Sequence, residues 1–302
     1  MQLDYELAIV GLVVGFVVGI TGMGGGALMT PILVILFKVQ PLAAVSSDLV
    51  ASFFMKPLGA AVHYRRGTVH RELVLWLMVG SVPSAFAGVV LLRLLGHGHE
   101  IQQVVQTALG VALILAAAAI VVKAVLQLRT PVHGAGVDAG HAGEPVRRLP
   151  TILVGVVGGL VVGMTSVGSG SLMIVALMLL YPRLTAARLV GTDLTQAIPL
   201  VGSAAIGHVL FGDFRLSLTV SLLLGAIPGV YLGARASAQA PSGIVKRAIA
   251  FVLLASGLKL INIGTVQLGV LLLAVAIAGE PVWALIRRTS SRPAPPVVVP
   301  EA

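Results

Sequence analysis

A single lysine, Lys56, lies inside a long apolar segment that covers residues 43–63. An ammonium at the centre of a membrane helix costs at least about 2.5 kcal/mol, so such a residue is a candidate functional group. An anion is the ligand that an isolated ammonium attracts. Ser52 and His63 share a helix face with Lys56. The alternatives are a lysine that extends to the membrane surface or one that pairs with Asp48, two turns earlier on the same helix.

Two acidic motifs and two histidines occupy matching positions in two apolar segments. Ser47-Asp48 lies near the start of the segment 43–63, and Thr192-Asp193 lies near the start of 186–210. These carboxylates are candidates for carrying a coupling proton or binding a cation, and the structural alternative is a helix-start charge that the helix dipole favours. His63 and His208, at the far ends of the same segments, are candidates for proton coupling because histidine titrates near neutral pH. An interfacial position is the alternative for both histidines.

Two glycine- and serine-rich stretches, 19–31 and 163–173, interrupt the two longest apolar segments near their centres. Each glycine costs a helix interior roughly 1 kcal/mol, so both segments are expected to break there. Backbone groups freed in a membrane must be buried in protein or face a wet cavity. A helix that restarts after the break directs free N–H groups at it, which suits an anion, and hydroxyls add further donors. Close packing through small residues and back-bonding of hydroxyls to their own helix are the alternatives.

These patterns define the candidate site residues. Gly25 and Gly170 are expected to adopt positive φ angles, which only glycine takes freely. The candidate substrate-binding residues are Thr21, Gly22, Gly24, Gly25, Gly26, Ser47, Lys56, Thr165, Ser166, Gly168, Ser169, Gly170 and Thr192. The candidate proton-coupling residues are Asp48, His63, Asp193 and His208.

The composition places these residues in a membrane protein. Of the 302 residues, 57% are hydrophobic and 10% are charged, whereas a soluble domain carries roughly 25% charged residues. The sequence has no cysteine, which excludes disulfides, thiol catalysis and Cys-based metal sites. The net charge of +9 is distributed between the apolar segments, as membrane topology requires, so it does not indicate nucleic-acid binding. We expect a multi-pass, all-α protein of the bacterial plasma membrane, with the lipid bilayer as its surroundings.

The chain contains an internal repeat. The first glycine-rich stretch aligns with the second, and Asp48, His63 and Gly80 align with Asp193, His208 and Gly225 at one constant spacing. Repeats of this kind are typical of transporters. The expected division is a first transmembrane repeat (1–128), a cytoplasmic linker (129–149), a second repeat (150–265), one extra transmembrane helix (266–286) and a disordered cytoplasmic tail (287–302).

The positive charges predict how the repeats lie in the membrane. Basic residues gather at 65–71, 123–148, 183–188, 235–247 and the C-terminal end, and all of these fall on the cytoplasmic side only if each long segment enters and returns as a hairpin. Each half then has three full crossings, so the second half is inverted relative to the first. The two arms of each hairpin are expected to be about 13 residues long, or roughly 20 Å. The two hairpin tips would meet near the midplane, where broken helices form substrate sites.

A glycine-rich tip followed by Pro31, a hydroxyl-Asp motif in the next segment, and a copy of both in the other half resemble the TauE/SafE family of sulfite and organosulfonate exporters. The resemblance covers nearly the whole chain except the linker. The second tip departs from the pattern, with Ser166 and Ser169 in place of glycines and Val175 in place of the proline. The resemblance implies a membrane transporter of small anions.

The sequence therefore predicts a secondary-active exporter of a small sulfur-containing anion, such as sulfite or an organosulfonate, that works by alternating access. It has no ATP-binding loop, and neither a metal site nor a cofactor is expected. Two alternatives stay open: a carrier of another solute or a cation that uses Asp48 and Asp193, and a non-transporting membrane subunit. An enzyme is not expected, because no acid–base pair lies at helical spacing. A homodimer is an open option.

Overall fold

The computed structural model describes residues 4–21, 25–96, 98–129, 145–211, 214–236, 242–275 and 277, and these confirm the expected all-α architecture. Most of the linker, the C-terminal tail, and residues 276 and 278–286 of the expected helix 266–286 lie outside the described residues. The named helices are α1 (Tyr5–Thr21), α2 (Gly26–Ile35), α3 (Pro41–Arg65), α4 (Arg71–Leu95), α5 (His99–Arg129), α6 (Arg148–Thr165), α7 (Leu172–Leu180), α8 (Ala186–Phe211), α9 (Leu216–Ala236) and α10 (Ser242–Leu260). A further helix covers Thr265–Val275.

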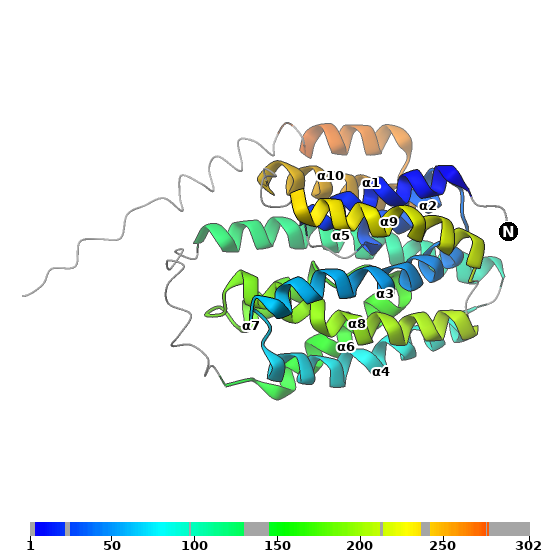
Figure 1. Ribbon diagram of the computed structural model, residues 1–302. Coiled ribbons are helices and arrows are strands. Elements are labelled where there is room, and N and C mark those ends of the chain that lie inside the picture. Colours follow the sequence, from blue (N-terminus) through cyan, green and yellow to red (C-terminus); the bar gives the residue numbers. More distant parts are fainter. Residues whose placement is uncertain are drawn as a thin grey trace, which may run out of the picture.

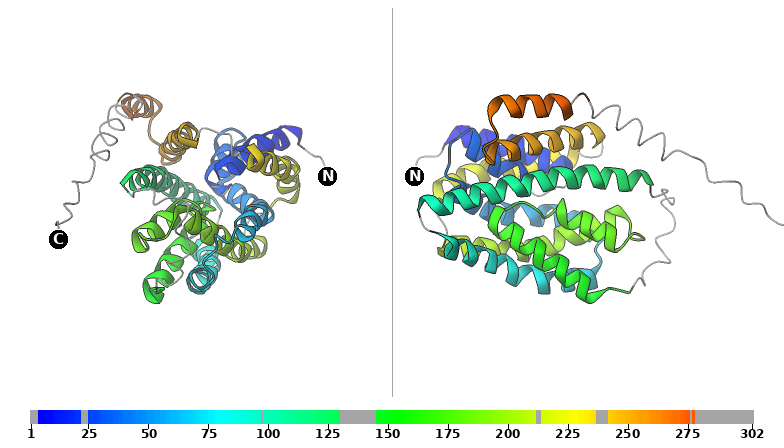
Figure 2. Two further views of the ribbon diagram at one scale, coloured as in Figure 1. Left: turned by 60° about the vertical axis from the view of Figure 1, so that its left-hand side comes forward. Right: turned by 180° about the vertical axis from the view of Figure 1, so that it is seen from behind.

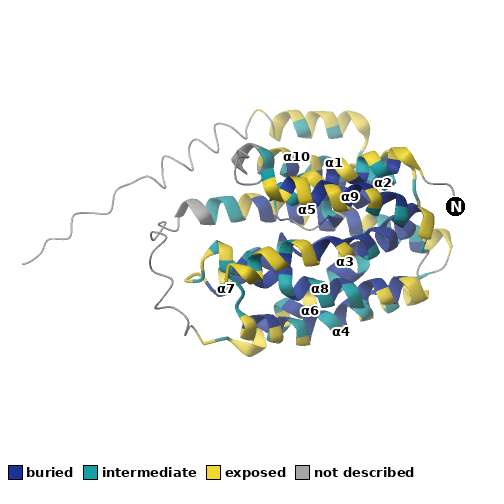
Figure 3. Ribbon diagram, viewed as in Figure 1, coloured by how far each residue is buried: buried dark blue, intermediate teal, exposed yellow. Residues whose placement is uncertain are grey.

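Five helices in the described part of the chain are long and apolar enough to cross a membrane, namely α4, α5, α6, α8 and α9. The bundle is elongated along the common direction of these helices (Figure 1). Exposed residues lie along its outer faces (Figure 3), and many of them are large and apolar, such as Leu75, Val157 and Leu224. Apolar side chains on the outside of long helices are typical of contact with lipid, so the chain is a multi-pass membrane protein.

Both long apolar segments break where the glycine-rich stretches predict. The break separates α1 from α2 and α6 from α7, but the arms are unequal: 17 and 10 residues in the first pair, 18 and 9 in the second. The expectation of two equal arms was therefore wrong. The other glycines of the long arms α1 and α6 do not end these helices, because each of them packs closely against a neighbouring helix.

Each broken pair begins and ends at the same end of the bundle. In the second pair, Thr151 Oγ1 at the start of α6 lies 2.6 Å from the Tyr181 hydroxyl at the end of α7. In the first pair, the Asp4 amide donates to Ser221 Oγ at 3.1 Å, and Arg215, at the start of the same helix α9, donates to Gln40 Oε1 at 3.4 Å. Both pairs are therefore hairpins within the described structure.

The long arm of each hairpin packs against a helix of the other half. α1 lies along α9, and α6 lies along α4, as Figures 1 and 2 show. Glycines at every fourth position permit this contact: Gly11, Gly15 and Gly19 of α1 each press on the backbone of α9, and a Cβ at any of them would clash there. Gly155, Gly159 and Gly163 do the same for α6 on α4. Such small-residue spacing is how membrane helices approach closely.

α3 and α8 run antiparallel to each other. The end of α3, at His63, lies beside Gly191 near the start of α8, whereas the start of α3 lies beside Arg215, just beyond the end of α8. α5 and α10 also cross antiparallel, since Gly110 lies near Ile261 and Ile114 near Gly257.

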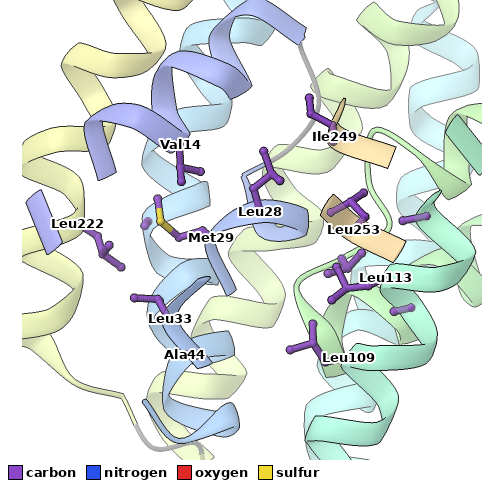
Figure 4. Close-up of a cluster of buried hydrophobic side chains, with 14 of the residues drawn as sticks. Val14, Leu28, Met29, Leu33, Ala44, Leu109, Leu113, Leu222, Ile249 and Leu253 are labelled. Atoms are coloured by element: carbon purple, nitrogen blue, oxygen red, sulfur yellow. The ribbon is translucent and has the colours of Figure 1, made fainter. Parts of the chain in front are cut away.

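The core lies where the hairpins meet the remaining helices. Figure 4 shows one cluster, in which Val14 of α1, Met29 of α2, Leu222 of α9, Leu113 of α5 and Leu253 of α10 converge. Met29, Leu222, Leu113 and Leu253 are fully buried. A second buried cluster joins α3, α4, α7 and α8. The short arms α2 and α7 are thus enclosed by helices from both halves.

Candidate substrate-binding site

The two helix breaks touch each other inside the bundle. Gly26, where α2 begins, lies directly against Ser166, where α6 has just ended, and a Cβ on Gly26 would clash with the carbonyl and hydroxyl oxygens of Ser166. Ser166 has a left-handed backbone, with φ of 60°, which turns the chain out of α6. The glycine at position 26 is therefore required by close contact between two segments that are far apart in the sequence.

Asp48 connects α3 to both hairpins. One oxygen, Oδ2, accepts a hydrogen bond from Ser166 Oγ at 2.6 Å and another from Thr30 Oγ1 at 2.9 Å. The carboxylate is fully buried. Asp48 lies eight residues inside α3, so it is not a helix-start charge as the structural alternative required.

Lys56 reaches the tip of the second hairpin. Its Nζ donates to Ser169 Oγ at 2.8 Å, and the side chain is 6% exposed. It does not extend to the membrane surface. No hydrogen bond joins the ammonium to Asp48 or Asp193 in the described structure. The cation is thus held by a serine hydroxyl of the second tip.

Asp193 on α8 is the counterpart of Asp48 and is also fully buried. Its Oδ1 accepts from Gln196 Nε2 at 3.1 Å, and the backbone amide of Gly170 contributes a favourable electrostatic interaction. Gln196 in turn accepts from Ser81 Oγ at 3.0 Å, which ties the carboxylate to α4. The tip of the second hairpin therefore contacts both acidic residues.

The site retains hydrogen-bonding capacity that the described residues do not use. Most buried polar atoms in proteins have a partner, so each exception requires an explanation. The buried side-chain oxygens without a partner are Ser47 Oγ, Asp48 Oδ1, Ser52 Oγ, Ser171 Oγ and Asp193 Oδ2. All five belong to the acidic motifs, the Lys56 face or the second tip.

The two tips differ in backbone conformation. Gly168 and Gly170 adopt φ of 132° and 89°, and an isolated backbone bridge joins them, so the expectation for Gly170 is confirmed. Gly25 has φ of −56°, an ordinary helical value, so the expected positive φ was wrong. Its role is spatial, since a Cβ there would lie 2.9 Å from Met55 Cε and 3.8 Å from Asp48 Oδ1.

Several predicted residues lie outside this cluster of contacts. Thr21 and Thr165 donate to the carbonyls of their own helices, at 2.8 and 2.6 Å, as the back-bonding alternative describes. Thr192 accepts from the His70 amide at 3.0 Å and so fixes the start of α4. Ser47 is buried in α3 without a hydrogen-bond partner. Gly22 and Gly24 lie outside the described residues.

The two histidines have different surroundings. His63 is half-buried at the end of α3, where its Nδ1 lies 3.0 Å from Thr68 Oγ1. His208 is fully buried between Ser46 Oγ and Gly163 O, each at 2.8 Å. Neither ring is hydrogen-bonded to Asp48, Asp193 or Lys56 in the described structure.

Sequence reasoning missed Thr30 and Gln196. Each lies inside an apolar segment close to a predicted site residue: Thr30 directly before Pro31, and Gln196 one turn after Asp193. That proximity was an available signal. Separately, a cavity of about 730 Å³ lies where α1 and α9 begin, lined by residues such as Asp4, Glu6 and Arg215, and none of the candidate residues lines it.

Comparison with known proteins shows the family. The family model for the sulfite exporter TauE/SafE matches residues 7–260, which include every helix of the site. The chain belongs to the TauE/SafE family. Relatives in Bacillus subtilis (strain 168) include the probable membrane transporter protein YjnA, 38% identical over 86% of this chain and all of that protein. The probable membrane transporter proteins YdhB and YunE are 25% and 24% identical and cover 84% and 85% of this chain and 99% and 97% of their own lengths. No solved structure matches significantly.

Proposed function

We propose that this protein is a secondary-active exporter of a small sulfur-containing anion such as sulfite or an organosulfonate, and not an enzyme. We propose a substrate site where the two helix breaks touch. The observation that carries the proposal is the buried ammonium of Lys56, hydrogen-bonded to Ser169 at the tip of the second hairpin. Family membership supports transport as the activity.

The chemistry of the site suits an oxyanion. Lys56 supplies a positive charge, Ser169 and Ser171 supply hydroxyls, and Gly168 and Gly170 hold the backbone of the tip outside the helical conformation. Charge-assisted hydrogen bonds of this kind hold anions without complete desolvation. When the anion binds, the Lys56 ammonium gives up its hydrogen bond to Ser169 and forms one with the anion.

The two buried carboxylates imply a proton partner. An anion placed beside two ionised carboxylates would be repelled strongly in a dry interior. Protonation of Asp48 or Asp193 removes that repulsion, so anion and proton binding favour each other. We therefore assign proton coupling to these two residues, ahead of His63 and His208.

The arrangement of the halves supports alternating access. Equivalent helices cross antiparallel, and each hairpin packs on a helix of the other half. This is the packing expected of two inverted repeats, each with a re-entrant hairpin, whose relative rocking exposes a fixed central site to one side at a time. We place the basic helix ends, at Arg65, Arg71 and Arg148, on the cytoplasmic side of the plasma membrane.

Flux measurements with purified protein in liposomes test the proposal. We expect uptake or release of labelled sulfite, competition by sulfoacetate and thiosulfate, and stimulation by a pH gradient. Wild-type protein without flux of any of these anions, under conditions in which it remains folded, would contradict the proposed substrate class.

A cation carrier is the second candidate, and one observation favours it. Asp48 Oδ1, Asp193 Oδ2 and the hydroxyls of Ser47 and Ser52 are buried and without partners, and hard cations are bound by such oxygen donors. Including a divalent metal and sodium in the same liposome panel separates the two candidates. Flux of a cation with no anion present would favour the second.

A further inference from the structure

The second helix break deprives one backbone carbonyl of its usual partner. α6 ends at Thr165, so the last carbonyls of this helix lack N–H donors within it. The Ser166 amide donates to Val162 O at 2.7 Å, and the Val167 amide donates to Thr165 Oγ1 at 3.2 Å. In a continuous helix the Val167 amide would donate a hydrogen bond to Gly163 O. Gly163 O therefore needs a donor from another segment.

His208 on α8 supplies that donor. Its Nε2 lies 2.8 Å from Gly163 O, and because a carbonyl only accepts, Nε2 carries the proton. Its Nδ1 lies 2.8 Å from Ser46 Oγ on α3, a hydroxyl that also lies 2.7 Å from Leu42 O. The single Ser46 proton is donated to Leu42 O, so Nε2 is the ring donor that the contacts define, and one fully buried side chain lies against α8, α6 and α3.

We propose that His208 is a positioning residue that fixes the second break, and that it does not carry the coupling proton. Gly163 lies three residues before Ser166, which binds Asp48, and six before Ser169, which binds Lys56. Gly163 also presses on the α4 backbone at Ala85, a contact that a Cβ would not tolerate. An orphan carbonyl in a membrane interior is costly. Without His208 the end of α6 would reorganise and carry the site residues with it.

The inference deepens the proposed function, because the break that His208 fixes is part of the proposed substrate site. His63, the equivalent residue of the first half, provides a matched control. It bonds to Thr68 at the half-buried end of α3 and contacts no carbonyl of a broken helix among the described residues.

Hydrogen–deuterium exchange of the full-length protein tests this role without a substrate. His208→Gln keeps an amide N–H near the position of Nε2, whereas His208→Leu removes the donor. We expect exchange across residues 166–171 to rise roughly tenfold in His208→Leu, equivalent to about 1.4 kcal/mol, and to stay near wild type in His208→Gln and His63→Leu. Equal exchange in wild type and His208→Leu would overturn the proposal, as would an equal rise in His208→Gln.

Transport then separates positioning from proton transfer. Neither glutamine nor leucine titrates. If His208 carried the coupling proton, both variants would therefore lose sulfite flux driven by a pH gradient to the same extent. Both would keep sulfite exchange when the pH is equal on the two sides of the membrane. A positioning residue predicts that His208→Gln keeps both activities and that His208→Leu loses both. If the wild-type protein moves no sulfite, the proposed substrate fails, while the deuterium exchange still decides the role of His208.

Discussion

Lys56 is the residue on which the proposed anion binding depends most directly. Lys56→Met keeps the apolar stem and removes the charge, so we expect sulfite affinity to fall by roughly 1–3 kcal/mol, or about 5- to 150-fold, as for other charge-assisted contacts. The measurement is the concentration dependence of flux in liposomes. Lys259→Met is the matched control, since Lys259 is exposed near the end of α10 and bonds only to Thr265 among the described contacts. Unchanged affinity in Lys56→Met would remove Lys56 from the site.

A double substitution distinguishes substrate binding by Lys56 from simple neutralisation of the carboxylates. If Lys56 only balances Asp193 or Asp48, Lys56→Met should reduce the yield of folded protein, and Lys56→Met combined with Asp193→Asn or Asp48→Asn should restore both yield and transport. We expect yield to recover and transport not to recover, because no cation remains to attract the anion. Recovered transport in either double variant would refute the substrate role.

The two tip glycines should respond differently to substitution. Gly170→Ala forces a side chain into φ of 89°, which costs roughly 1–3 kcal/mol, and we expect flux to be lost. Gly25→Ala keeps an ordinary φ and meets the flexible end of Met55, so we expect most flux to remain. Initial rates at matched protein amounts in the liposomes provide the comparison. Equal loss of flux in both variants would show that the space around each glycine, and not its backbone conformation, determines the effect of the substitution.

The charged residues of the site and two of their hydroxyl partners, Ser166 and Ser169, were predicted from the sequence, whereas Thr30, the other partner of Asp48, was not. Lys56, Asp48 and Asp193 stand out because ionisable groups inside apolar segments are costly. Thr30 and Thr21 look alike in sequence, since each is a threonine in a broken apolar segment. Only the fold decides that Thr30 donates to Asp48 while Thr21 donates to its own helix.

At the scale of helices, the contact between α4 and α6 should not tolerate a larger side chain in place of its glycines. A Cβ at Gly159 would clash with the Ser81 carbonyl and Ser84 Oγ, so Gly159→Leu should separate the helices and destabilise the protein by roughly 1–3 kcal/mol or more. A lower midpoint of thermal unfolding in detergent would report this. Gly269→Leu is the control, because nothing lies within 4 Å of the position where its Cβ would be. Equal midpoints for the two variants would contradict close packing.

The position of the breaks was predictable, but the lengths of their arms were not. Gly11, Gly15 and Gly19 lower the intrinsic helix propensity of α1 as much as the glycines of the tip do. They remain helical because each fits against the backbone of α9. Since that partner lies some two hundred residues away in the chain, a local reading of the sequence could not separate packing glycines from tip glycines.

For the whole molecule, labelling of single cysteines tests the proposed orientation, with the N-terminus outside and both hairpins returning to their own side. The native sequence contains no cysteine, so each introduced one reports alone. We expect an impermeant thiol reagent to label Gln40→Cys only from outside the cell and Arg183→Cys only from the cytoplasm, since both side chains are exposed at opposite ends of the bundle. Labelling of Gln40→Cys only from the cytoplasm would show that the protein has the opposite orientation in the membrane.

Aligned landmarks such as Asp48 with Asp193 predict a duplication of the chain, but they do not indicate which helices pack together. Local sequence indicates that α1 has a small-residue face, but α4 and α9 present similar faces. The choice of the distant partner is a property of the assembled bundle, in which α1 meets α9 and α6 meets α4.

The reciprocal packing of hairpins has a consequence for biogenesis. The glycine face of α1 leaves the ribosome long before its partner, since α1 ends at Thr21 and α9 ends at Ala236. At roughly 5–20 residues per second, the first hairpin waits on the order of 10–40 s in the membrane with its small-residue face uncovered. A nascent chain truncated at the linker could not complete this contact, so quality-control proteases should recognise the isolated N-terminal half, and synthesis of the missing half in the same cell should rescue it.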